Sequence, residues 1–484
     1  MQSTFARKAF PCWDEPALKA TFDVTLVVPE DLVALANSAE EVVTRLENGW
    51  KEVKFLPTCQ MSTYLVAFVI GDLAYVEGHT DDGIQIRVYA DPSKVDQGRY
   101  ALEVAQKGLK FYGEYFGIKY QLSKCDLVAI PDFAMGAMEN WGLITYREVR
   151  LLLDETKSSS SVKEDIANTE WWTDLWLNEG FATWLSHHFV NIAYPEFDTW
   201  TQFVNLETAR AMKLDSLHSS HPIEVTINDP EEVETIFDVV SYSKSASIIR
   251  MLHDYLGDKL FRKGLQTYLK KFQFQNARTA DFWQCLSDAS GRDVAALMSN
   301  WTKWMGYPVV QVSMTHVESE NPLKLEQRRF LDDGSIEVPF YVQLNYGFTG
   351  FYRVQYSEPM LNSLLKAVRH EQLSAVDRLN ICNDIFALAR AGIIPAVTYF
   401  NALKSYKDET DYTVWADIDQ GIDVVWNCLE RTPYLNNFKS FCRSLYKHIA
   451  AKLGSEPIAG ECKYTTVHIF CLLSDAACLT NVEV

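Results

Sequence analysis

The first part of the chain carries the alternating apolar and polar pattern of β-strands. The segment ATFDVTLVVP (residues 20–29) alternates in this way and ends at a proline. A second segment, MSTYLVAFVIGDLAYVEG (residues 61–78), is rich in β-branched and aromatic residues and is broken by glycine. This pattern predicts a β domain over residues 1–80.

The pattern becomes mixed over residues 81–306. A strand-like segment, GIQIRVYA (83–90), precedes YALEVAQKGLKFYGEYF (100–116), whose apolar residues recur at helical spacing. Another strand-like segment, CDLVAIP (125–131), leads into a loop with glycine and methionine, and helical patterns dominate after Asn168. Strands followed by helices in this way predict a domain of mixed α and β structure.

Two more regions follow in the chain. GYPVVQVSMTHVE (306–318) and GFYRVQY (350–356) predict a short β module over residues 307–356, and consecutive helical patterns predict a helical domain over residues 357–484. A chain of 484 residues is long enough for roughly three or four domains. The predicted fold class is therefore multidomain α+β.

Composition limits the classes of partner. The formal net charge of −19 argues against nucleic acid and against an anionic membrane surface, and it is compatible with cationic ligands such as the free amino ends of peptides. The sequence shows neither the apolar core of a signal peptide nor a run of about 20 apolar residues that could span a membrane. The 10 cysteines include no CxxC pair, so we expect a cytoplasmic protein under reducing conditions.

One carboxylate lies within an apolar helical segment. In NTEWWTDLWLNEGFATWL (residues 168–185), apolar residues recur at spacings of three and four, and Glu179 lies on or beside this apolar stripe. Burying a carboxylate is costly unless it is hydrogen-bonded, protonated or bound to a cation. Glu179 is therefore either the ion-pair partner of an arginine or lysine from elsewhere in the fold, or a metal ligand.

Two other segments offer candidate functional residues. In GAMENWGLITYRE (136–148), small residues beside Glu139 leave the backbone open, so a strand edge could pair there with an extended peptide, although a loop with a solvated glutamate fits as well. In DVVSYSKSASIIRML (238–252), Tyr242 begins an amphipathic helix, where packing is the usual role of a tyrosine.

Taken together, these segments resemble the gluzincin aminopeptidases of the puromycin-sensitive type. The resemblance covers residues 4–457 with gaps, and DRLNICNDIFALARAG extends it into a helical C-terminal domain. The other similar segments are, in chain order, FPCWDEPALKATF, MSTYLVAFVIG, GAMENWGLITYRE, EWWTDLWLNEGFATW, HPIEV and VSYSKSASIIRML. The resemblance implies a β-saddle, a thermolysin-like α/β catalytic domain, a small β-sandwich and an α-helical domain. It also implies a zinc metallo-aminopeptidase that removes N-terminal residues from peptides.

The resemblance assigns substrate binding to the GAMEN segment. By this resemblance Glu139 is expected to bind the free α-amine of the peptide, which is the partner that we expect for this chain. The backbone around Gly136 and Ala137 is expected to pair with the peptide, and Met138 and Asn140 complete the segment.

The resemblance also implies a zinc site that this sequence does not complete. Glu179 is expected to be the carboxylate ligand of zinc, and Tyr242 is expected to donate a hydrogen bond to the oxyanion of the tetrahedral intermediate. The other zinc ligands of such enzymes are the two histidines of an HExxH helix, whose glutamate is the general base. The spacing in the family places these histidines at Thr156 and Ser160, and the sequence contains no HExxH.

The missing helix predicts an inactive chain. About four helical turns are absent before Glu170, so both histidine ligands and the general base are lost. Three alternatives remain open: a non-enzymatic module that binds peptide amino ends, an active enzyme with substitute metal ligands, and a chain that does not fold stably. His187 and His188 are the candidates for such ligands, although two surface histidines are the ordinary interpretation.

Other parts of the family pattern are shortened as well. The β-saddle and the β-sandwich are expected to be remnants, and the helical domain is expected to be truncated, with a divergent tail from about residue 458. Loss of the HExxH helix is expected to leave apolar surface without packing partners at Trp171, Trp172 and Trp176.

Overall fold

The computed structural model describes residues 5–134, 136–154, 175–225, 238–314, 323–335 and 348–453. The chain forms two compact units. Unit 1 consists of Met1–Phe197, Thr226–Asp238 and Leu252–Ser299. Unit 2 consists of Asp198–Val225, Val239–Met251 and Asn300–Val484.

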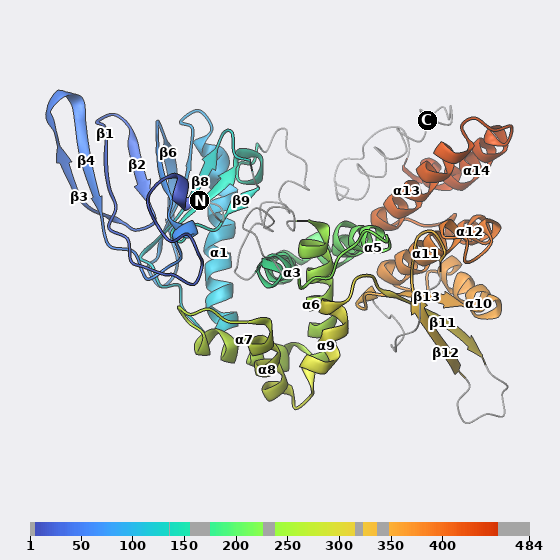
Figure 1. Cartoon of the computed structure of the whole chain (residues 1–484). Coiled ribbons are helices and arrows are strands. Elements are labelled where there is room, and N and C mark those ends of the chain that lie inside the picture. Colours follow the sequence, from blue (N-terminus) through green and yellow to red (C-terminus); the bar gives the residue numbers. More distant parts are fainter. Residues whose placement is uncertain are drawn as a thin grey trace. The chain divides into compact units, whose positions relative to one another are not determined.

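Unit 1 begins with the predicted β domain, which the structure confirms (Figure 1). Three of its strands form an antiparallel sheet in the order β1-β4-β3, and two others form an antiparallel pair. These strands are β1 (Thr25–Pro29), β2 (Val33–Ala36), β3 (Glu40–Arg45), β4 (Trp50–Phe55) and β5 (Phe68–Gly71).

A five-stranded mixed sheet follows in the order β6-β7-β8-β10-β9. Strands β7, β8 and β10 are parallel, whereas β6 and β9 pair antiparallel at the two edges. Strand β8 is buried along nearly its whole length, which is the pattern of a strand covered on both faces. The strands are β6 (Ala74–His79), β7 (Gln85–Ala90), β8 (Lys124–Ile130), β9 (Ala137–Met138) and β10 (Leu143–Arg147).

Helix α1 (Arg99–Phe116) connects β7 to β8 and packs beside β6 and β7 (Figure 1). The helix ends at Gly117, whose φ of 64° is the left-handed conformation that glycine adopts at helix ends. The apolar core between helix and sheet includes Ile86, Val88 and Leu127, all of them buried. The helix and the two strands predicted for these segments are therefore confirmed.

A buried ammonium group joins the N-terminal β domain to the five-stranded sheet. Lys124 Nζ donates hydrogen bonds to the backbone oxygens of Ala36 (2.7 Å) and Gly142 (2.8 Å) and to Asp126 Oδ2 (2.7 Å). Arg87 donates two hydrogen bonds to the same carboxylate, at 2.8 and 2.9 Å. Burying a charge is tolerated only when such partners replace water, and here they do.

A buried amide reinforces the same junction. Asn37 Nδ2 donates to the backbone oxygens of Leu65 (2.9 Å) and Trp141 (2.8 Å). The residue after Trp141 is Gly142, whose φ is 78°, and a Cβ there would lie 2.3 Å from the Asn37 backbone oxygen. Glycine is therefore the residue that this turn accepts, both for its conformation and for the space available.

The helices of unit 1 keep Trp176 buried. Its ring lies 5.9 Å from that of Trp283, and Trp176 Nε1 donates to Thr279 Oγ1 at 3.2 Å. The expectation that Trp176 lacks packing partners is therefore wrong, because helix α8 covers it; Trp171 and Trp172 lie outside the described residues. The helices involved are α3 (Leu175–Ala193), α7 (Asp258–Lys271) and α8 (Thr279–Ser290).

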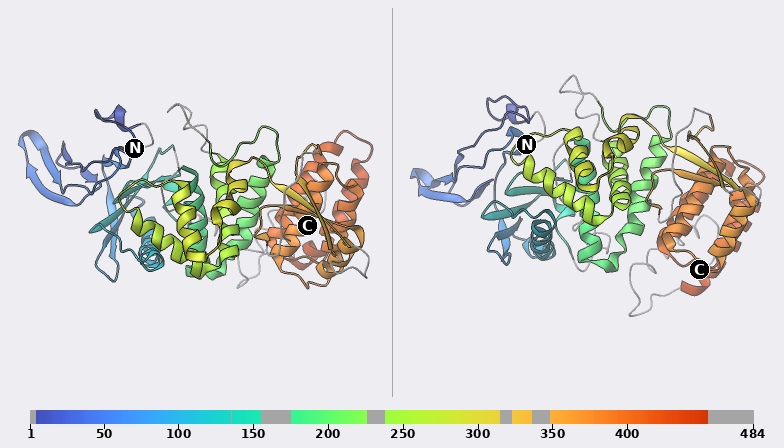
Figure 2. Two further views of the ribbon diagram at one scale, coloured as in Figure 1. Left: turned by 60° about the horizontal axis from the view of Figure 1, so that its bottom comes forward. Right: turned by 90° about the horizontal axis from the view of Figure 1, so that it is seen from below.

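Unit 2 contains a three-stranded sheet and the helical C-terminal region (Figure 2). Strand β11 (Pro308–Met314) pairs antiparallel with β12 (Leu323–Arg329) and parallel with β13 (Arg353–Tyr356). Asp384 ties a helix to this sheet, because its carboxylate accepts from Arg353 Nη1 at 3.0 Å and from the Val354 backbone at 2.9 Å.

The described helices of unit 2 confirm the predicted helical domain and the α+β class. The tail expected to diverge from about residue 458 lies outside the described residues. Helices α6 (Ser245–Leu256) and α9 (Val294–Lys303) contribute residues to both units. The others are α4 (Thr199–Phe203), α5 (Arg210–Asp215), α10 (Glu358–Arg369), α11 (Ala375–Arg390), α12 (Ala396–Leu403), α13 (Tyr412–Leu429) and α14 (Leu435–Leu453). Among the described helices, none is both long and apolar enough to cross a membrane.

The Lys124 junction can be tested by substitution. Lys124→Met leaves the Ala36 and Gly142 carbonyls without their buried donor, so we expect the free energy of unfolding of unit 1 to fall by about 3–5 kcal/mol. Urea unfolding followed by circular dichroism measures the change. The control is Lys110→Met, which removes an exposed lysine paired with Asp81 and is expected to change stability little. Equal effects of the two substitutions would contradict the role of Lys124.

The turn at Gly142 generates a second test. Gly142→Ala forces a Cβ toward the Asn37 carbonyl at a positive φ, and we expect a loss of about 1–3 kcal/mol in unfolding free energy. Gly136→Ala is the matched control, because a Cβ there has no atom within 4 Å and its φ is not positive. A thermal unfolding midpoint unchanged by Gly142→Ala would show that the turn is not constrained as described.

Candidate functional site

The GAMEN segment forms the edge of the five-stranded sheet among the described strands. Its strand β9 pairs with β10, with Ala137 opposite Tyr146, and Arg147 donates its backbone N–H to the Gly136 oxygen at 2.9 Å. In an antiparallel ladder, the backbone groups of successive residues point alternately toward and away from the partner strand. Since Gly136 bonds to β10, the backbone N–H and C=O of Ala137 point away from it.

The next side chains of the segment hold it against the N-terminal β domain. Asn140 is buried, donates to the Leu65 backbone oxygen at 3.3 Å and accepts from the Thr145 hydroxyl at 3.2 Å. Met138 packs against the apolar cluster that contains Leu65 and Met61. These two side chains hold the C-terminal end of the segment in place. Gly136, at its other end, is exposed.

Glu139 lies between the strand and this anchor. Its side chain is half-buried, and the loss of water around the carboxylate raises its pKa above the usual value of 4.5. The side chain is therefore less solvated than the alternative interpretation, a loop with a solvated glutamate, predicts. A cation placed beside Glu139 would offset the cost of its desolvation.

Glu179 lies on helix α3 and is half-buried, as its position beside the apolar stripe predicts. The positions at which the family pattern would place the two histidine ligands, Thr156 and Ser160, lie outside the described residues. His188 lies nine positions after Glu179 on the same helix, which is about two and a half turns. The two side chains therefore leave α3 on opposite faces, about 13 Å apart along its axis.

The expectation of two surface histidines on α3 is wrong. His187 is 5 % exposed and its Nδ1 lies 2.7 Å from the Thr183 backbone oxygen. His188 is 9 % exposed, and its ring contacts those of Phe111 and Tyr115 of α1. The aromatic side chains of a neighbouring helix bury this face of α3, and the periodicity of one helix does not reveal such a neighbour.

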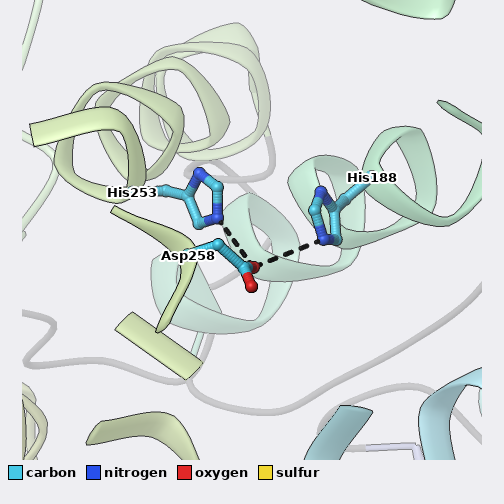
Figure 3. Close-up of side chains that lie close together, drawn as sticks. All are labelled: His188, His253 and Asp258. Carbon is cyan, nitrogen blue, oxygen red and sulfur yellow. Dashed lines mark hydrogen bonds and ion pairs between the residues drawn. The ribbon is translucent and has the colours of Figure 1, made fainter. Parts of the chain in front are cut away.

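His188 converges with two residues that sequence reasoning missed (Figure 3). His188 Nε2 lies 4.0 Å from Asp258 Oδ1, and His253 Nε2 lies 3.2 Å from the same oxygen. Burial lowers the pKa of His188 to about 4, so its ring is neutral at physiological pH. Metal ligands in proteins are mainly histidine, cysteine, aspartate and glutamate. Among the described residues, these three side chains form the one cluster of such residues that could hold a metal ion.

The sequence carries only a weak signal for this group. His253 and Asp258 lie five positions apart, in HDYLGD, where one continuous helix would point them in different directions. Gly257 has a φ of 77° and ends α6 just before α7 begins, so the two side chains turn toward one point. The position of His253 near the end of one helix and of Asp258 in the first turn of the next could have suggested that these two form a pair. Nothing in the sequence indicates that His188 joins them.

Tyr242 lies in unit 2, whereas the GAMEN segment and Glu179 lie in unit 1. Tyr242 is half-buried in a π-helical turn, Val240–Lys244, that leads into α6, and it does not begin an ordinary α-helix as the sequence suggests. A fully buried ion pair fixes this turn, with Lys244 Nζ 2.8 Å from Asp215 Oδ2. The hydroxyl of Ser245 also donates to the Val240 oxygen at 3.1 Å.

Three domain families match the chain in order. Residues 1–65 match the "Peptidase M1 N-terminal domain", residues 100–301 match the "Peptidase family M1 domain", and residues 341–483 match the "ERAP1-like C-terminal domain". The match over residues 1–65 lies within the N-terminal β domain. The match over residues 100–301 covers the GAMEN segment, Glu179 and Tyr242.

Curated proteins similar to the chain are aminopeptidases by name. "Puromycin-sensitive aminopeptidase" of Caenorhabditis elegans is 41% identical, and the match covers 95% of this chain and 55% of that protein. "Aminopeptidase M1-A" of Oryza sativa subsp. japonica is 41% identical, over 94% of this chain and 58% of that protein. "Alanine/arginine aminopeptidase" of Saccharomyces cerevisiae is 36% identical, over 100% of this chain and 62% of that protein. The chain spans somewhat more than half the length of these relatives, and it contains in order regions that match the N-terminal and peptidase domains of the M1 family and an ERAP1-like C-terminal domain.

Proposed function

We propose that this chain binds the free amino ends of peptides at the edge of its five-stranded sheet and does not hydrolyse them by itself. The observation that carries the proposal is the position of the half-buried Glu139 carboxylate directly after the two-residue edge strand β9. The names of the relatives, all aminopeptidases, agree with a ligand of this class.

The backbone of β9 supports binding of an extended peptide. The N–H and C=O of Ala137 point away from β10, and a peptide added as a further strand would pair with them. Gly136 has open space where a Cβ would lie, so the backbone is accessible to a second chain there. Main-chain pairing of this kind does not depend on the peptide's side chains, which suits a general peptide ligand.

Glu139 supports recognition of the amino terminus in particular. Its carboxylate loses part of its hydration in the free protein, and this loss raises its pKa. A peptide ammonium group supplies the opposite charge and the hydrogen-bond donors that would restore the ionised form. The net charge of −19 favours the approach of cationic groups in general.

The residues present do not fit the family's catalytic zinc. Such a site needs about three protein ligands and a general base, and the sequence contains no HExxH motif to provide them. Glu179 is not part of the group that could hold a metal within the described ranges. The match to the C. elegans protein extends over 519 positions, more than the 484 residues of this chain, so that protein has residues inside the matched region that this chain lacks.

Helix geometry argues against an enzyme with substitute ligands around Glu179. His188 leaves α3 on the face opposite Glu179, and His187, eight positions after Glu179, lies about 12 Å from it along the helix axis. Neither ring is therefore placed to share an ion with Glu179. Within this proposal, Tyr242, the oxyanion donor that the family resemblance implies, has no intermediate to stabilise.

Peptide titration tests the proposal. We expect the full chain to bind a peptide with a free amino terminus saturably, and Glu139→Gln to weaken binding by about 10- to 100-fold because a charge-assisted hydrogen bond is lost. Isothermal titration calorimetry measures the affinity, and a fluorogenic aminoacyl amide tests for turnover. Glu148→Gln is the matched control, since Glu148 pairs with Lys94.

Two outcomes would contradict this proposal. If an N-acetylated peptide binds as tightly as the free one, Glu139 does not read the amino group. If the chain hydrolyses the aminoacyl amide, and the activity resists purification to one component, it contains a catalytic site that the residues described above do not explain.

The pH dependence of binding gives a separate test of Glu139. The pKa of Glu139 is raised in the folded protein, so folding favours the protonated carboxyl. The contribution of Glu139 to folding stability is therefore present below the pKa of the unfolded chain, and it is lost as pH rises through the pKa of the folded protein. Binding of an ammonium has the opposite dependence, because it needs the ionised carboxylate. We expect affinity to fall as pH decreases, with a midpoint above the usual 4.5, and Glu139→Gln to remove this dependence. A midpoint at or below 4.5 would contradict the assignment.

A further inference from the structure

We propose that His188, His253 and Asp258 form a binding site for a divalent transition-metal ion such as zinc, separate from the position of the family's catalytic metal. This inference goes beyond the proposed peptide binding and does not depend on it. The ion would join helix α3 to the junction between α6 and α7 within unit 1.

The three ligand atoms already converge (Figure 3). Both imidazole Nε2 atoms face Asp258 Oδ1, at 4.0 Å for His188 and 3.2 Å for His253, and all three ligand atoms lie within 4.8 Å of one another. Ligand atoms around one tetrahedral zinc ion lie about 3.3 Å apart, given metal–ligand bonds of about 2.0–2.2 Å. Small side-chain rotations would therefore bring the three atoms to a common ion.

The surrounding residues hold the ligands in place. The Trp184 ring stacks on that of His188, with centroids 5.0 Å apart and planes at 13°, and it lies 5.0 Å from the ring of His253. The Tyr115 hydroxyl lies 3.3 Å from Asp258 Oδ1, which orients the carboxylate from outside the ligand set. Such outer hydrogen bonds commonly support metal ligands in proteins.

The donor set suits zinc or a neighbouring transition metal better than it suits magnesium or calcium. Two imidazole nitrogens and one carboxylate oxygen are the ligand types that zinc and cobalt(II) prefer, whereas magnesium and calcium prefer oxygen ligands alone. The Asp258 side chain is 53 % exposed, so an ion can reach the site from solvent and a water molecule can complete the coordination.

The contacts at Asp258 Oδ1 are compatible with a bound cation. The Tyr115 hydroxyl and His253 Nε2 lie within hydrogen-bond distance of this oxygen, at 3.3 and 3.2 Å, whereas His188 Nε2 lies 4.0 Å away. A shared cation would draw the three ligand atoms together, with one bond from each ligand. The site cannot include Glu179, because that side chain leaves α3 on the opposite face, about 13 Å along the helix from His188.

Metal analysis of the full chain tests this proposal. The chain is stripped with a chelator, equilibrated with Zn²⁺, desalted and analysed by elemental mass spectrometry, with Co²⁺ absorption as a second readout. We expect about one zinc ion per chain. We expect His253→Gln and Asp258→Asn each to weaken binding by roughly 100-fold or more, and Tyr115→Phe by about 10-fold, because it removes only an outer contact.

Matched variants separate this site from others. Glu179→Gln is expected to retain the zinc, and so is His448→Gln, which alters an exposed histidine that pairs with Asp408 at 2.6 Å. Asp258→Asn changes a half-exposed side chain, and circular dichroism checks that the variant folds. The proposal is overturned if the wild-type chain retains no zinc, or if Asp258→Asn retains it. Loss of zinc in Glu179→Gln or His448→Gln, with retention in His253→Gln, would also overturn it.

Discussion

The candidate peptide-binding edge depends on one buried ammonium group. Lys124 Nζ has no solvent to stabilise its charge, and it therefore holds its carbonyl and carboxylate partners at fixed positions. Those partners belong to the N-terminal β domain at Ala36, to β8 at Asp126 and to the turn at Gly142. Moving any one of these segments would leave the charge unsatisfied. The GAMEN segment lies just before this turn, so the hydrogen bonds of Lys124 also fix its position.

Sequence patterns predicted the parts of the fold that local spacing determines. Helix α1 lies where the 3.6-residue period places it, and strands β7 and β8 lie in the two segments that are strand-like in composition. The Lys124 network was not predictable, because Lys124 and its carbonyl partner at Ala36 are 88 positions apart. The π-helical turn at Tyr242 was missed for a similar reason: the ion pair between Lys244 and Asp215 that fixes it joins residues from different helices.

The candidate site shows the same division. The half-buried position of Glu179 followed from one helix, and the missing HExxH motif could be read directly, because it is a fixed pattern of residues. The burial of His188 depends on aromatic residues of α1, and its approach to His253 and Asp258 depends on how three helices pack. The periodicity of α3 indicates the face that carries Glu179. It does not indicate the face that carries His188, because the residues around His188 come from other helices.

Strand β9 is only two residues long, and this shortness has a consequence for the behaviour of the protein in solution. A long open strand edge is a template on which copies of a chain can assemble into continuous sheets, and short edge strands are one way in which proteins prevent this. Two residues span about 7 Å, which is enough to align the end of a peptide but too little to nucleate a growing sheet. The same edge can therefore stay open to a ligand without promoting aggregation.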